Sequence, residues 1–183
     1  MVSRYTVPGL ELEKAQKVAE GLQQRLTALL DLQLTLKHIH WNVVGPSFIG
    51  VHEMLDPQVD GVRAMSDAVA ERIATLGFEP MGTPGYIANH RSWDDYSLAR
   101  AGTQEHLAAL DLVYTGVNTD HRAAIAEFSE LDPVSEDLLI GQSEQLELYQ
   151  WFIRAHLEDK HGVLVSQGAA TEQGAAAAAE STG

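Results

Sequence analysis

Apolar side chains recur at helical intervals along four long stretches of this chain, and residues typical of turns separate the stretches. In the first stretch, residues 11–41, the stripe advances by alternating steps of 4 and 3, as in a helix packed in a bundle. Its members are Leu22, Leu26, Leu29, Gln33, Leu36 and His40. Similar stripes predict helices over about 47–76, 102–129 and 135–160. Because no stretch shows a convincing strand pattern, the sequence predicts an all-α fold, a bundle of four long helices.

The connection between the second and third long helices is long enough to hold a short extra helix. Residues 77–90 are dense in Gly, Pro and Asn and are expected to form a loop. Ser92 precedes Asp95 at the spacing of a capping box, which predicts a short helix over residues 92–96.

The second long helix carries a signal for its start and another that conflicts with it. Ser47 follows Gly45-Pro46 and is a suitable N-cap. Pro57 lies inside the predicted helix, where it removes a backbone hydrogen bond and disfavours helical geometry at Asp56. A kink or an irregular start is therefore expected there.

The bundle is expected to occupy residues 11–160, after an N-terminal arm at residues 1–10. Residues 161–183 are expected to form a disordered tail, because from Ser166 onward they contain no aromatic or large apolar side chain. The chain of 183 residues suffices for one domain.

Composition excludes several classes of protein. With no cysteine, the chain has no disulfide, iron–sulfur cluster or thiolate nucleophile. No apolar run reaches the length of a membrane span, and the N-terminus lacks the apolar core of a signal peptide, so a cytoplasmic protein is expected. Lys and Arg number 12 against 26 Asp and Glu, a formal charge of −14, which argues against general affinity for nucleic acid.

Five potential metal ligands recur at fixed steps of 12, 4, 11 and 4: His40, His52, Asp56, Asp67 and Glu71. Imidazoles and carboxylates together suit iron or manganese better than calcium or a structural zinc. The alternative is a set of solvated charges on a surface helix, the usual fate of Asp and Glu. That alternative suffices for either pair alone, whereas all five positions together favour a metal site.

The two pairs on the second helix are too far apart to share one ion within a subunit. His52/Asp56 and Asp67/Glu71 are both i,i+4 pairs on nearly the same side of the helix. They are separated by roughly 16 Å along the axis, at 1.5 Å per residue. Two copies packed antiparallel about a two-fold axis would bring the first pair of one subunit to the second pair of its partner, giving two shared sites.

Four segments of the chain resemble the signature of the Dps proteins, the mini-ferritins known as DNA-binding proteins from starved cells. The segments are residues 37–48 (KHIHWNVVGPSF), 51–56 (VHEMLD), 67–72 (DAVAER) and 149–154 (YQWFIR). The resemblance covers roughly residues 5–160. It implies a ferritin-like four-helix subunit in a hollow homododecamer, with ferroxidase sites at the two-fold interfaces.

The resemblance also implies roles for particular residues. His40, His52 and Asp56 would come from one subunit, and Asp67 and Glu71 from its partner. Iron(II) would be oxidised there, preferentially by hydrogen peroxide, and ferric mineral would be stored in the cavity. Trp41 would lie beside the site, although a buried aromatic of the bundle explains it equally well.

Iron entry is implied at acidic pores on a three-fold axis, near the end of the third long helix. The candidates are Asp120, Glu127, Glu130, Asp132, Glu136 and Asp137. For each of them singly, an ordinary solvated helix end is the simpler interpretation.

The sequence departs from the family pattern in its terminal segments. Family members that bind DNA tightly usually carry basic flexible tails, whereas residues 166–183 contain two glutamates and no basic residue, and Arg4 is the only basic residue before Lys14. No DNA-binding residue is therefore predicted. The alternative function is that of an architectural nucleoid protein whose metal residues are vestigial.

Overall fold

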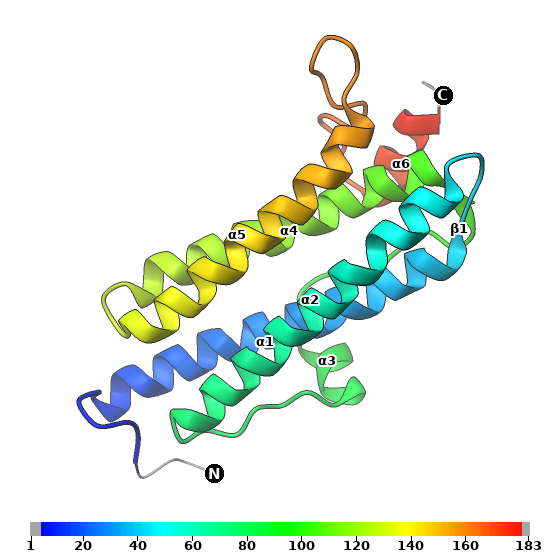
Figure 1. Ribbon diagram of the computed structural model, residues 1–183. Helices are drawn as coiled ribbons and strands as arrows, with labels where there is room; N and C mark the ends of the chain where they lie inside the picture. Colours follow the sequence, from blue (N-terminus) through cyan, green and yellow to red (C-terminus); the bar gives the residue numbers. More distant parts are fainter. Residues whose placement is uncertain (1–4, 181–183) are drawn as a thin grey trace.

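The computed structural model describes residues 5–180 and contains four long helices arranged as two antiparallel pairs (Figure 1). α1 (Leu12–Asn42) packs along α2 (Phe48–Thr75), and α4 (Thr103–Phe128) packs along α5 (Pro133–Leu157). The two pairs lie side by side to form one bundle (Figure 1). This arrangement confirms the predicted all-α bundle, and each long helix begins and ends within a few residues of the expected position.

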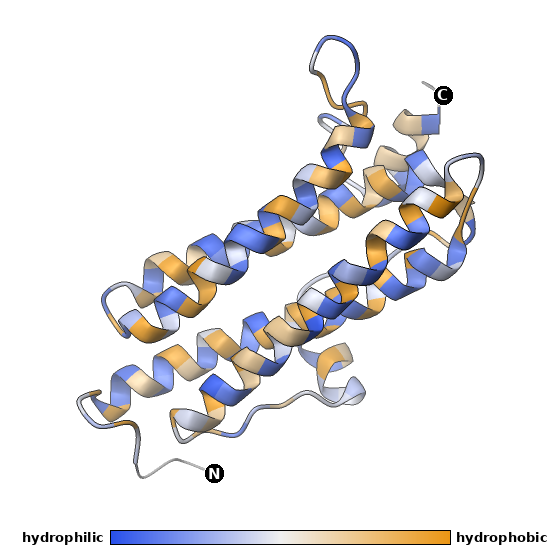
Figure 2. Cartoon of the chain, viewed as in Figure 1, coloured by the Kyte–Doolittle hydropathy of each residue, from blue (hydrophilic) through white to orange (hydrophobic). Residues whose placement is uncertain are grey.

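The apolar stripes read from the sequence form the core of the bundle. Leu22, Leu29 and Leu36 of α1 are fully buried, as are Leu55 and Val62 of α2. Hydrophobic and hydrophilic residues alternate along every long helix in the periodic pattern that the stripes require (Figure 2). Burial of these stripes between the helices provides most of the stability of such a bundle.

α2 runs through Pro57 without interruption, so an irregular start at Asp56 is wrong, and the alternative expectation of a kink stays a prediction. Ser47 occupies the N-cap position as predicted, although its hydroxyl makes no capping hydrogen bond. Pro57 is exposed and has no backbone N–H, so one hydrogen bond of the helix is missing at this position. The proline carbonyl accepts a hydrogen bond of 3.4 Å from the Tyr149 hydroxyl.

The predicted extra helix exists in the connection between α2 and α4, but at another position. α3 spans Pro84–His90, inside the expected loop, and begins with a proline in its first turn. Residues 92–96, expected to be helical, are not. Arg91 and Trp93 both bond to the Asp31 carboxylate of α1, at 3.1 and 2.7 Å, and these tertiary contacts hold the segment against the bundle.

Two short strands close the end of the bundle where α1 meets α4. β1 (Val43–Val44) pairs in parallel with β2 (Ala101–Gly102), and Val43 lies opposite Ala101. The sequence pattern gave no sign of this pairing, because strands of two residues are too short to show alternation.

The expected disorder of the C-terminal tail is wrong for its helical part. α6 spans Glu172–Glu180 and packs against α4 through its buried Ala175, Ala176 and Ala179. Glu172 accepts hydrogen bonds from the backbone N–H (2.6 Å) and hydroxyl (2.8 Å) of Ser97. Alanine side chains are short enough to let the two helices approach closely, so large apolar residues are not needed for docking. Residues 181–183, and residues 1–4 of the expected N-terminal arm, lie outside the described part of the chain.

Within residues 5–180, no helix is long and apolar enough to cross a membrane.

Candidate metal centre

His40 and His52 face each other across the turn that joins α1 to α2. Gly45 lies in this turn with a φ of 111°, a left-handed conformation that glycine adopts without strain. The chain thereby reverses within a few residues, and the two imidazoles stack with their centroids 3.6 Å apart and their planes 23° apart. Phe48 also contacts His52, with the ring centroids 4.8 Å apart and the planes tilted by 39°.

Reciprocal hydrogen bonds determine which nitrogen of each of these two rings donates. His40 Nδ1 lies 3.0 Å from the His52 carbonyl oxygen, and His52 Nδ1 lies 2.9 Å from that of His40. A carbonyl only accepts, so each Nδ1 must carry the hydrogen, and in the neutral ring the lone pair is then on Nε2. Histidines that bind metals in proteins usually donate their second N–H in this way. Both Nε2 atoms are therefore prepared to be ligands.

Asp56 adds an exposed carboxylate beside the two histidines. Its Oδ1 lies 2.8 Å from Lys37 Nζ and 3.3 Å from His40 Nδ1. The hydrogen bond from Lys37 is the main reason that the pKa of Asp56 is lowered, and the nearby histidines act in the same direction. The carboxylate is thus anionic at neutral pH and accessible to a cation, which would compete with the Lys37 ammonium.

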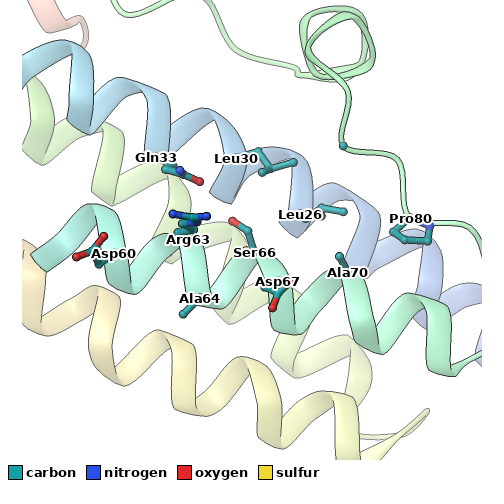
Figure 3. A pocket seen from close by; sticks show the side chains of 11 residues that line it. Leu26, Leu30, Gln33, Asp60, Arg63, Ala64, Ser66, Asp67, Ala70 and Pro80 are labelled. Atoms are coloured by element: carbon teal, nitrogen blue, oxygen red, sulfur yellow. The ribbon is translucent and has the colours of Figure 1, made fainter. Parts of the chain in front are cut away.

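Asp67 and Glu71 are exposed on α2 but away from the histidines. Asp67 borders an open groove between α1 and α2, along with Asp60 and Arg63 (Figure 3). Among residues 5–180, no group of three or more His, Cys, Asp or Glu side chains is placed to hold a metal ion. The structure brings His40 into contact with His52 and with Asp56, but the three side chains are not arranged as a metal site within the described subunit, and Asp67 and Glu71 lie further along α2.

A ferritin-like domain model matches residues 19–161 of the chain. A DNA protection during starvation protein (Dps) of Mycolicibacterium smegmatis is 58% identical over 175 residues, 96% of this chain and 96% of that protein. This chain belongs to the Dps family.

Solved structures of other Dps proteins share the fold over nearly the whole chain. Dps of Mycobacterium smegmatis superposes with a TM-score of 0.91 at 58% identity, covering 93% of this chain and 97% of that one. DpsA14 from Streptomyces coelicolor gives a TM-score of 0.88 at 59% identity, covering 90% and 98%. The ferritin-like fold predicted from the sequence is thereby confirmed.

The sequence did not determine the surroundings of Trp41 or the contact made by Lys37, two residues near the centre. Trp41 is 72% exposed in the single Dps subunit, so the interpretation as a buried bundle aromatic is wrong. The contact of Lys37 with Asp56 was not foreseen. Its signal in the sequence is weak, because the two residues lie on different helices and a lysine on a helix surface is ordinary.

The six candidate pore residues of this Dps chain fall into two groups. Asp132 is buried, caps the N-terminus of α5, and forms a 2.6 Å ion pair with Arg72, while Asp120 pairs with Arg25 at 3.3 Å. These carboxylates already have partners within the subunit, and Asp132 is enclosed. The remaining four make no ion pair within the described residues: Glu127, Glu130, Glu136 and Asp137.

Proposed function

We propose that this Dps protein is a ferroxidase that takes up Fe²⁺ as its substrate and stores the ferric product inside a hollow homododecamer. The observation that carries the proposal is the reciprocal bonding of His40 and His52, which uses both Nδ1 atoms and leaves Nε2 as the ligand atom of each neutral ring, with the Asp56 carboxylate close to the His40 ring. Such a mixed nitrogen and oxygen set accepts iron in both oxidation states.

The complete site is proposed to form only between subunits. One chain supplies three of the proposed ligands near the turn between α1 and α2: His40, His52 and Asp56. The other two, Asp67 and Glu71, are exposed further along the same face of α2. Antiparallel packing of two α2 helices about a two-fold axis supplies the missing carboxylates twice. The exposure of Trp41 supports the presence of a partner subunit near the site, because that subunit would bury this large apolar side chain.

The chemistry is an electron transfer from iron to peroxide. Two Fe²⁺ ions each give one electron to a hydrogen peroxide molecule and become Fe³⁺. The peroxide takes up two protons, its O–O bond breaks, and two water molecules form. The carboxylates would stabilise the higher charge of the product, and the histidines would orient the ferrous substrate. Removal of iron and peroxide together would protect DNA without contact, and a cytoplasmic location is part of the proposal.

His52→Ala tests the proposal directly. Fe²⁺ is added anaerobically to the assembled protein, then hydrogen peroxide, and ferric absorbance is followed by stopped flow. The wild type is expected to oxidise iron rapidly, and His52→Ala at a rate close to that of iron in buffer. His90→Ala, an exposed histidine that stacks on Tyr86 away from the centre, is the matched control and should be unaffected. Equal rates for wild type and His52→Ala would refute the ferroxidase proposal and favour the architectural alternative.

Mixing of inactive subunits tests whether the sites are shared. Subunits with His52→Ala are combined with subunits with Asp67→Ala and Glu71→Ala. In a mixed dimer one of the two shared sites keeps all its ligands, so partial activity is expected. If mixed dimers remain inactive although both parents fold and assemble, the ligands are not shared as proposed.

Iron entry through acidic pores is proposed for the four carboxylates that have no ion pair in the described subunit. Like charges gathered at an opening attract cations and concentrate them. Replacement of Glu127, Glu130, Glu136 and Asp137 by the corresponding amides should slow mineral growth without affecting single-turnover oxidation at the centre. Unchanged uptake in all four amide variants would reject this assignment.

A further inference from the structure

The proposed ligands on α2 belong to a longer stripe that is symmetric about its own middle. The steps between its members are 4, 4, 3, 4 and 4, which read the same in both directions. The members are His52, Asp56, Asp60, Arg63, Asp67 and Glu71. At about 100° per residue they span an arc of roughly 100°, a single face of the helix. Apart from the partly exposed His52, all of them are exposed in the subunit.

The symmetry of the stripe fixes which residues meet in an antiparallel pair. A two-fold axis that brings His52 opposite Glu71 and Asp56 opposite Asp67 must cross α2 between Gly61 and Val62. The same axis brings Asp60 of one subunit opposite Arg63 of the other, and does so twice. The positions nearest the axis, where the helices are closest, therefore carry opposite charges.

Neither of these two residues has an oppositely charged partner among residues 5–180, although the Asp60 charge, after burial of the phenol, helps to raise the pKa of Tyr149. Both border the open groove between α1 and α2 (Figure 3). Among residues 5–180, neither Asp60 nor Arg63 takes part in an ion pair, whereas most of the other basic side chains do. An unpaired guanidinium is notable in a chain that has 26 acidic and 12 basic residues.

We propose that Asp60 and Arg63 form reciprocal ion pairs across the two-fold axis, and that these pairs fix the register at which the two α2 helices meet. They are positioning residues, which contact no iron. A shift of one helical turn would separate them and would also move the ligand pairs out of opposition. The inference rests on the proposed function, because the position of the axis comes from the proposed ligands.

Charge reversal gives a test with a distinctive pattern. In Asp60→Arg homodimers, arginine meets arginine at both positions, and in Arg63→Asp homodimers aspartate meets aspartate. Like charges at an interface are costly, and we expect each variant alone to associate at least about tenfold more weakly than the wild type. A mixture of the two variants restores opposite charges at both contacts, so heterodimers should form selectively. The double variant Asp60→Arg/Arg63→Asp should also recover association.

Association is followed by native mass spectrometry over a dilution series of the metal-free full-length protein, with circular dichroism as the check on folding. Arg100→Asp is the matched control, since Arg100 is also exposed and without an ion pair among residues 5–180. Single variants that associate no more weakly than Arg100→Asp would overturn the proposal. So would a double variant and a mixture that associate as poorly as the single variants.

Cross-linking measures the register independently of charge. The chain has no cysteine, so any disulfide must come from introduced thiols. A mixture of Asp60→Cys and Arg63→Cys subunits should give a disulfide-linked dimer on mild oxidation, because facing positions near a helix crossing have suitable Cα separations. A mixture of Arg63→Cys with Arg100→Cys should not. Absence of the first cross-link would contradict the register.

The outcomes also separate this inference from the proposed function. All of these measurements are made without iron. If the association pattern holds but the wild type oxidises no Fe²⁺, the register stands and the ferroxidase proposal fails. If the wild type oxidises iron but the pattern is lost, the ion pairs are wrong and the ferroxidase proposal stands.

Discussion

Asp132 offers a quantitative test of the interpretation that it stabilises the subunit and does not line a pore. Its Oδ2 accepts a 2.6 Å hydrogen bond from Arg72 Nη2 of α2 and a 3.2 Å bond from the backbone N–H of Ser135. The Ser135 hydroxyl donates to the same oxygen. One carboxylate thus caps α5 and ties it to α2, with its side chain only 7% exposed and that of Arg72 14%.

Two substitutions separate these contributions. Asp132→Asn retains a side chain that caps helices well but loses the charge opposite Arg72. Hydrogen bonds to charged groups contribute about 1.5–3 kcal/mol, and the low exposure of both side chains leaves little screening. Asp132→Ala also loses the cap, which costs about a further 0.5–2 kcal/mol. We therefore expect losses of about 1.5–3 kcal/mol for Asn and about 2–5 kcal/mol for Ala.

Thermal unfolding of the assembled protein at one fixed concentration measures the effect, since association contributes to stability. For a chain of this size 1 kcal/mol corresponds to about 2–4 °C in Tm. Asp132→Asn should lower Tm by about 3–12 °C and Asp132→Ala by more. Asp137→Ala, an exposed acidic residue in the same first turns of α5, should change Tm by less than about 2 °C. If the two substitutions at Asp132 are as mild as Asp137→Ala, the energetic role inferred from the contacts is refuted.

The pH dependence of the same effect has a definite sign. Burial alone would raise the pKa of Asp132, but the hydrogen bonds from Ser135 and Arg72 outweigh it and lower the pKa below its ordinary value. A depressed pKa in the folded state gives stability that is fully present above the unfolded value, about 4, and is lost as pH falls through the folded value. The Tm difference between the wild type and Asp132→Asn should therefore be constant from pH 5 to 7 (roughly, from these pKa values) and should shrink in stronger acid. A difference that grows in acid would contradict the assignment.

Three further predictions concern other parts of the chain. Glu172→Ala removes the acceptor of both Ser97 hydrogen bonds, so hydrogen exchange in α6 should become at least about tenfold faster, while Glu180→Ala should leave it unchanged. Gly61→Ala should cost about 1–3 kcal/mol, because its Cβ would overlap the Tyr149 hydroxyl, and Tyr149→Phe should recover part of the loss, as measured by Tm. The intact oligomer should not retard plasmid DNA in a gel-shift titration at about 0.15 M salt, because DNA affinity depends on cations that neutralise phosphates. Salt-sensitive retardation that disappears on deletion of residues 1–10 would contradict this last prediction.

The sequence alone determined the long helices and the identity of the proposed ligands. Helical periodicity is local, and the stripe through Leu22, Leu29 and Leu36 specifies a buried face whatever lies opposite. The spacing of His52, Asp56, Asp67 and Glu71 is equally local, because helix geometry converts sequence separation directly into distance along an axis. For this reason the separation of the two ligand pairs was predictable, and both pairs lie on the one continuous helix α2.

The tertiary structure decided whatever depends on contacts between distant segments. Residues 92–96 have a capping pattern but are not helical, because Asp31 of α1 binds Arg91 and Trp93. α6 is ordered because α4 offers a surface to a row of alanines, which have no hydrophobic signature of their own. Asp132 caps α5 through local bonds to Ser135, whereas its ion pair depends on Arg72, which the fold brings from α2. The local sequence pattern predicts which secondary structure a segment prefers. Packing between distant segments decides whether that structure forms, and which carboxylates remain unpaired and available for function.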